Sequence, residues 1–99
     1  KEAPKEVQEL FSHLDDLAPR KAVFVMMDGT VTDPVGPKDL ASAANEADGA
    51  IAIIYNGSIS DKTLDIASEA AIETVVGTKE GKGYGKRDDV QSWLVEVHR

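Results

Sequence analysis

Cationic side chains gather in one glycine-rich segment, residues 77–87, where they could bind phosphate or carboxylate groups. The segment reads GTKEGKGYGKR and carries one acidic residue among four cationic ones. Tyr84 lies among its glycines and could stack on a nucleic-acid base or on an apolar patch of a protein. The G-x-x-x-x-G-K-[ST] pattern of a nucleotide-binding phosphate loop is absent. Two interpretations stay open: contact with RNA or an acidic protein, or a mobile solvated loop. The candidate contact residues are Lys79, Lys82, Tyr84, Lys86 and Arg87.

Other residues that could do chemistry lie in weaker patterns. Trp93 is expected in the core or at the rim of an interface, where aromatic side chains often anchor a partner. His13 and His98 are far apart and the chain has no Cys, so we expect no metal site. The adjacent carboxylates Asp88 and Asp89 point apart if they enter a strand, and are interpreted as solvated charge. We therefore predict no catalytic and no metal-ligating residue in this chain.

A short acidic motif, MMDGTVTD at residues 26–33, resembles the opening of haloacid-dehalogenase-type phosphatases. In that family D-x-D-G-T-[LV]-[TV] supplies a nucleophilic aspartate and, two residues later, an acid/base aspartate. Here Met26 stands at the nucleophile position, and a thioether cannot be phosphorylated. We therefore interpret Asp28-Gly29 as a type I′ hairpin turn, which needs positive φ at both central residues. A degenerate phosphatase built on Asp28 remains as an alternative.

Composition limits the classes of protein to consider. Of 99 residues, 41% are hydrophobic and 29% charged, which is typical of one folded domain spanning 1–99. Eleven Lys and Arg against 18 Asp and Glu give a net charge of −7, which disfavours nucleic-acid binding by the whole surface. No apolar run could span a membrane and no signal-peptide pattern opens the chain, so we expect a cytoplasmic protein. Because it starts at Lys1 without Met, we expect a fragment of a longer protein.

The elements that must position these residues alternate between helix and strand. Apolar residues at helical spacing and Pro19 predict a helix over 4–18, and the six-residue apolar run 22–27 predicts a buried strand. Strands separated by helices require crossover connections and hence a mainly parallel sheet. The fold class predicted is α/β, a small mainly parallel sheet flanked by helices with one N-terminal β-hairpin, its core over 22–97. The remaining predicted elements are a strand 30–32, a helix 38–47, a strand 50–55, a helix after Ser60, a strand 72–76 and a strand 93–97.

The order and spacing of motifs over residues 22–83 resemble the C-terminal domain of archaeal DnaG-type primases, which follows their Toprim catalytic domain. The first is VGPKDL at 35–40, which leads into a helix. The most telling are DGAIAIIYNGSIS at 48–60, TLDIA at 63–67 and VVGTKEG at 75–81. Together these motifs cover about 60 residues in the order that the family has.

The resemblance implies a binding role, not a catalytic one. The catalytic carboxylates of a primase, and the Mg²⁺ they bind, would belong to a Toprim domain absent from this chain, so the fragment itself is expected to be no enzyme and to need no cofactor. The family is also a subunit of the archaeal RNA exosome, attached through a cap protein with a zinc ribbon and an S1-type domain. The resemblance thus implies docking onto that cap and, through the assembled complex, engagement of adenine-rich RNA.

Three surfaces are candidates for such docking. Two are possible sheet edges, at the Asp28-Gly29 hairpin and at the predicted strand 93–97, where a partner could add a strand. The third is the apolar face of the N-terminal helix, at Phe11 and Leu14, although packing on the sheet would also explain these residues.

Overall fold

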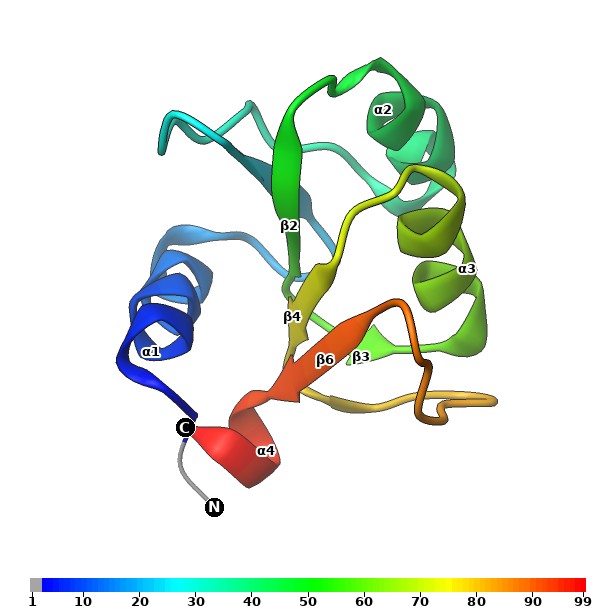
Figure 1. Ribbon diagram of the computed structural model, residues 1–99. Coiled ribbons are helices and arrows are strands. Elements are labelled where there is room, and N and C mark those ends of the chain that lie inside the picture. Colours follow the sequence, from blue (N-terminus) through cyan, green and yellow to red (C-terminus); the bar gives the residue numbers. More distant parts are fainter. Residues whose placement is uncertain (1–2) are drawn as a thin grey trace.

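A four-stranded sheet lies between helices on both of its faces in the computed structural model, which describes residues 3–99 (Figure 1). The strands run in the order β1-β2-β4-β6 across the sheet. The pair β1–β2 is antiparallel, whereas β2–β4 and β4–β6 are parallel. The predicted α/β class with a mainly parallel sheet and an N-terminal antiparallel pair is therefore confirmed. The strands are β1 (Ala22–Met26), β2 (Ala50–Tyr55), β4 (Thr74–Gly77) and β6 (Gln91–Leu94).

Each face of the sheet is covered by its own helices (Figure 1). On one face lie α1 (Lys5–Ser12) and the 3₁₀ turn η1 (His13–Asp16). On the other lie α2 (Leu40–Glu46), entered through the 3₁₀ turn η2 (Pro37–Asp39), and α3 (Asp61–Glu69). The helix predicted over 4–18 is therefore shorter as an α-helix and ends in a 3₁₀ turn. The helix predicted over 38–47 begins with a 3₁₀ turn instead.

Two apolar clusters form the core because the central strands are buried on both faces. Phe24 and Ile53 pack towards α2 and α3 with Leu64, while Val23 and Ile54 pack towards α1. This two-sided burial explains the continuous apolar runs of β1 and β2 in the sequence. It also places Phe11 and Leu14 in the core, with 0% and 7% of their surface exposed. Of the two explanations for these residues, packing on the sheet is therefore confirmed, and they do not form an exposed docking face.

The predicted hairpin forms, but with a different turn. Met26 N–H donates to the Thr30 carbonyl and Gly29 N–H donates to the Met26 carbonyl, each at 2.8 Å. Of the loop residues 27–29, Gly29 alone has positive φ, at +89°, so the loop is a three-residue connection and not the type I′ turn that was predicted. Predicted strand 30–32 is not a regular strand, although Thr32 N–H donates to the Phe24 carbonyl of β1 at 3.0 Å. Isolated bridges join Val31 and, farther along, Val35 to β1. Those bridges cover the outer edge of β1, the first of the two predicted docking edges.

The C-terminal strand was predicted too long and too late. β6 ends at Leu94, and residues 95–98 form the single turn α4 (Val95–His98) instead of continuing the strand to 97. The Leu94 N–H donates to His98 Nδ1 at 3.0 Å, so the imidazole satisfies a backbone donor that a further strand residue would have left open. The strand predicted over 72–76, by contrast, starts later than predicted, at Thr74, because Ala71 takes a positive φ of 58°.

A second, two-stranded parallel sheet lies in segments where no strand was predicted. It pairs β3 (Ser58–Ile59) with β5 (Lys79–Glu80). Ser60, which directly precedes the predicted helix, caps α3, its hydroxyl accepting from Thr63 N–H at 3.4 Å. None of the helices formed by residues 3–99 has the length and apolar character that crossing a membrane requires.

Candidate binding groove beside strand β6

The cationic segment 77–87 is held against α3 by its backbone. After β5 pairs with β3, Gly81 N–H donates to the Ile59 carbonyl at 2.8 Å. The Asp61 N–H, in the first turn of α3, donates to the Lys82 carbonyl at 3.0 Å. At Gly83, with φ of +71°, a Cβ would stand 2.7 Å from the Asp61 carboxyl carbon. The segment therefore packs closely against the start of α3. Its cationic side chains project from a backbone that hydrogen bonds hold in place.

The Arg87 side chain binds two residues of α3. Its Nη1 lies 2.7 Å from the Asp65 carboxylate, and its Nη2 donates to the Asp61 carbonyl at 3.2 Å. Within residues 3–99 none of the lysines of the segment takes part in an ion pair. Lys79, Lys82 and Lys86 are all exposed. Arg87 thus fixes the end of the segment, and the lysines provide the cationic groups that a ligand could meet.

A groove of about 370 Å³ lies where this segment meets β6. It brings together four of the six contact residues predicted from the sequence, namely Tyr84, Lys86, Arg87 and Trp93, whereas Lys79 and Lys82 are not part of its wall. The wall holds two cationic side chains and no carboxylate, although acidic residues outnumber basic ones in the chain. The residues that line it are Tyr84, Lys86, Arg87, Val90, Gln91, Ser92, Trp93 and His98.

The aromatic side chains of the groove are held in place by a hydrogen bond and by a ring-to-ring contact. The Tyr84 hydroxyl hydrogen-bonds the Ser92 hydroxyl. The rings of Trp93 and His98 meet edge to face, with centroids 5.1 Å apart and planes at 75°. Because His98 Nδ1 accepts from Leu94 N–H, its proton belongs on Nε2. The groove is therefore preorganised, which lowers the conformational entropy lost when a ligand binds.

Ser92 and His98 are groove residues that the sequence reasoning missed. From the sequence, His98 was considered only as a metal ligand, yet its carbonyl accepts from the Gln8 side chain at 3.0 Å and from Ala3 N–H at 2.9 Å. A signal existed in hindsight, because the four-residue spacing of Leu94 and His98 suits one helical turn. The contact with Gln8 spans 90 residues and has no local signal.

The outer edge of β6 borders the groove. Gln91 N–H donates to the Glu73 carbonyl at 2.7 Å, so it faces β4. Backbone groups alternate in direction along a strand, so the N–H and C=O of Ser92 face away from β4. Within residues 3–99, no group outside the β4–β6 ladder bonds the Ser92 backbone. Of the two predicted docking edges, this one is left open for pairing.

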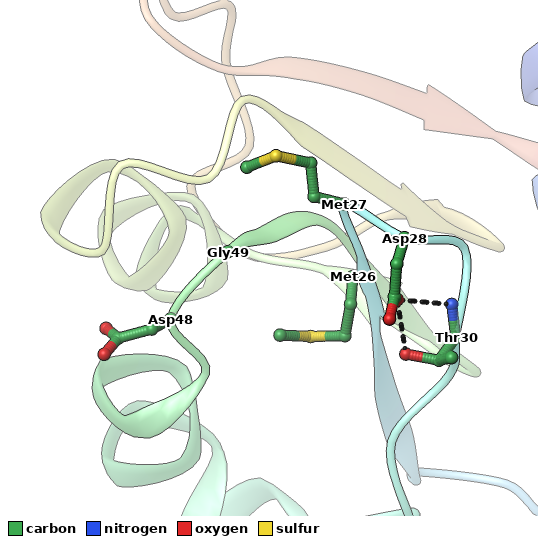
Figure 2. Close-up of a pocket in the computed structure, with 6 residues that line it drawn as sticks. All are labelled: Met26, Met27, Asp28, Thr30, Asp48 and Gly49. Carbon is green, nitrogen blue, oxygen red and sulfur yellow. Dashed lines mark hydrogen bonds between the residues drawn. The ribbon is translucent and has the colours of Figure 1, made fainter.

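The motif at Asp28 lines a different and shallower opening of about 340 Å³ (Figure 2). Asp28 Oδ1 accepts from the Thr30 hydroxyl at 2.7 Å and from Thr30 N–H at 3.0 Å. These bonds, the hydroxyl first, hold the pKa of Asp28 below its ordinary value. Figure 2 shows the Asp48 carboxylate across the opening and directed away from Asp28. Asp28 therefore organises its own loop, and among residues 3–99 no second carboxylate joins it.

Metal ligands do not gather in the described part of the chain. Over residues 3–99, no group of three or more His, Cys, Asp or Glu side chains could hold an ion. The neighbouring acids Asp88 and Asp89 do not act together, since the Asp89 carboxylate accepts from the Ser68 hydroxyl.

Comparison with known proteins shows similarity to archaeal primases. The chain is 32% identical over 79 residues to "DNA primase DnaG" of Methanocella arvoryzae, which is 79% of this chain and 16% of that protein. It is 40% identical over 45 residues to "DNA primase DnaG" of Pyrococcus abyssi, covering 46% of this chain and 10% of the relative. The protein of the same name from Pyrococcus horikoshii is 38% identical over 45 residues, with the same shares covered.

This chain spans about a tenth to a sixth of the length of the curated relatives it matches. No protein-family profile and no solved structure matches it. The chain is therefore related to a region of the archaeal DNA primase DnaG.

Proposed function

We propose that this chain is a protein-docking domain, equivalent to the C-terminal domain of an archaeal DnaG-type primase, and that it binds the cap subunit of the RNA exosome that carries a zinc ribbon and an S1-type domain. Through this contact it links its parent protein to RNA degradation or tailing, and to adenine-rich RNA held by the assembled complex. Primer synthesis and Mg²⁺ binding belong to a Toprim domain of the parent. The similarity to DNA primase DnaG supports the class of the parent protein.

One observation carries the docking role: a preorganised groove with apolar and cationic walls borders an open strand edge. Such a surface suits a protein partner, because aromatic side chains in a desolvated pocket supply much of the affinity of protein interfaces. The groove holds the Ser92 hydroxyl and the His98 imidazole, but Ser92 bonds Tyr84, and within residues 3–99 no hydrogen bond joins it to His98. Over the same residues, neither opening gathers a set of metal ligands. Binding is thus the activity that the geometry supports best.

Direct RNA contact by the segment 77–87 is the second candidate, favoured by its exposed lysines. Three observations weaken it. The ion pair with Asp65 reduces the charge that Arg87 can offer to a phosphate, and the Tyr84 hydroxyl is bonded to Ser92 with the ring packed against the core. In addition, the net charge of −7 repels a phosphate backbone.

Size-exclusion chromatography with light scattering tests the proposal. The chain is mixed at micromolar concentration with the cap protein of the same organism, or separately with an adenine-rich oligonucleotide. We expect a complex of one chain with one cap protein and no shift with the oligonucleotide alone. Separate elution from the cap protein contradicts the docking role, and co-elution with the oligonucleotide alone favours the RNA alternative.

A further inference from the structure

We propose that the groove beside β6 binds an extended acidic segment of the partner, which adds as a strand to the outer edge of β6. This inference rests on the proposed docking function and names the surface and the ligand chemistry. The proposed ligand of the groove is a short stretch of the partner in β conformation, with carboxylates and at least one apolar side chain.

Backbone geometry supports strand addition at one position. The N–H and C=O of Ser92 face outward, and no group outside the β4–β6 ladder bonds them within residues 3–99. The next outward-facing N–H along β6, that of Leu94, is not available to a partner, because it donates to His98 Nδ1 at 3.0 Å. The other sheet edge, along β1, is occupied by the bridges of Val31 and Val35. Pairing at β6 is thus short and centred on Ser92, which limits uncontrolled addition of further chains.

The side chains of the groove match an alternating segment. Trp93 packs with the core cluster beneath α1, and Tyr84 packs with the cluster beneath α2 and α3. Successive side chains of an added strand point to opposite faces. One set would therefore meet the Trp93 and His98 rings, and the other would meet Tyr84 and Val90.

Charge selects the acidic occupant. The groove wall has two cationic side chains and no carboxylate, on a chain with net charge −7. The rest of such a surface repels a carboxylate-rich segment, so the groove provides a local exception that fixes where it binds. Arg87 shares its charge with Asp65, whereas Lys86 is exposed and has no ion pair within residues 3–99. Lys86 is therefore the principal cation available to the ligand.

Two matched pairs of variants test the surface with the intact chain and the cap protein. Lys86→Glu reverses a groove charge, and Lys82→Glu makes the same change in net charge outside the groove wall. Ser92→Pro removes the outward N–H and the hydroxyl, whereas Ser92→Ala removes the hydroxyl alone. Dissociation constants come from calorimetry, and thermal unfolding shows that each variant is folded. Because Lys86 is exposed, its variant keeps the test decisive if Ser92→Pro fails to fold.

We expect Lys86→Glu to weaken binding about 10-fold or more and Lys82→Glu less than about 2-fold. Ser92→Pro should weaken it about 10-fold relative to Ser92→Ala, the equivalent of one lost backbone hydrogen bond. If the unaltered chain binds but Lys86→Glu and Ser92→Pro bind equally well, the surface is wrong and the docking function stands. Equal losses in both lysine variants overturn the groove in favour of a diffuse charge contact, as RNA would make. Failure of the unaltered chain to bind overturns the docking function and this surface together.

Discussion

Single polar residues in this chain mostly stabilise loops. Asp28 receives two hydrogen bonds from Thr30, and Arg87 bridges the Asp65 carboxylate and the Asp61 carbonyl. In both cases a residue type that suggests chemistry in the sequence is used to fix a backbone turn. Residue type alone cannot distinguish these uses, because the deciding partner of Arg87 lies more than twenty positions away.

The Asp28 loop gives a pH-dependent prediction. Replacing Thr30 by Val removes the hydroxyl donor and should raise the pKa of Asp28 part of the way to its ordinary value of 3.8. Because the pKa of Asp28 is lowered in the folded state, the hydrogen bond stabilises the fold fully above the ordinary pKa. This stabilisation is lost as pH falls through the folded-state pKa. The unaltered chain should therefore be more stable than the variant at pH 7, with the difference vanishing in acid. Carboxyl NMR titration measures the pKa, and an unchanged value contradicts the hydrogen bond.

The same site tests the phosphatase alternative. Met26→Asp supplies the nucleophile that the motif lacks, with the double variant Met26→Asp, Asp28→Asn as its control. We expect no Mg²⁺-dependent hydrolysis of p-nitrophenyl phosphate by either variant, because no cluster of three acidic or imidazole ligands exists in the described residues. Hydrolysis by the single variant that the double variant loses contradicts this account.

At the scale of elements, the sequence predicted what local patterns determine. The buried strands and the cap of α3 follow from apolar runs and from Ser60, and they are confirmed. The β3–β5 sheet was missed because two-residue strands carry no periodicity, and Lys79 and Glu80 are not typical strand formers. The predicted strand 93–97 failed because the His98 contact with Leu94 favours a turn. Four of the predicted contact residues line one groove, three of them from a single loop, and their role in binding stays a prediction.

Glycines in the segment 77–87 give a matched prediction at this scale. A Cβ at Gly77 would lie 2.3 Å from Ile59 Cγ1, and Ile59 is fully buried between the two sheets. Gly77→Ala should therefore lower the free energy of unfolding by about 1–3 kcal/mol. A Cβ at Gly85 meets nothing within 4 Å, so Gly85→Ala should change it by less than about 1 kcal/mol. Urea denaturation measures both, and equal losses would show that close packing of β3 on β4 is not the cause.

Across the whole molecule, the two ends of the described chain hold the groove together. Ala3 and Gln8 bond the His98 carbonyl, and Arg99 makes two bonds to the Asp15 carboxylate at 3.0 and 3.2 Å. The Arg99 guanidinium lowers the pKa of Asp15. Figure 1 shows α4 beside the start of α1, far from α2. Contacts between opposite ends of a sequence leave no local pattern, which is why the groove could be predicted only in part.

The most direct test of the docking role is a calorimetric titration of this chain into the zinc-ribbon exosome cap protein of the same organism. We predict a dissociation constant below about 10 μM, equivalent to a binding free energy of about −7 kcal/mol. Measuring at two temperatures guards against a binding enthalpy that happens to be near zero. Absence of heat at both temperatures, with both proteins shown to be folded, would contradict the account.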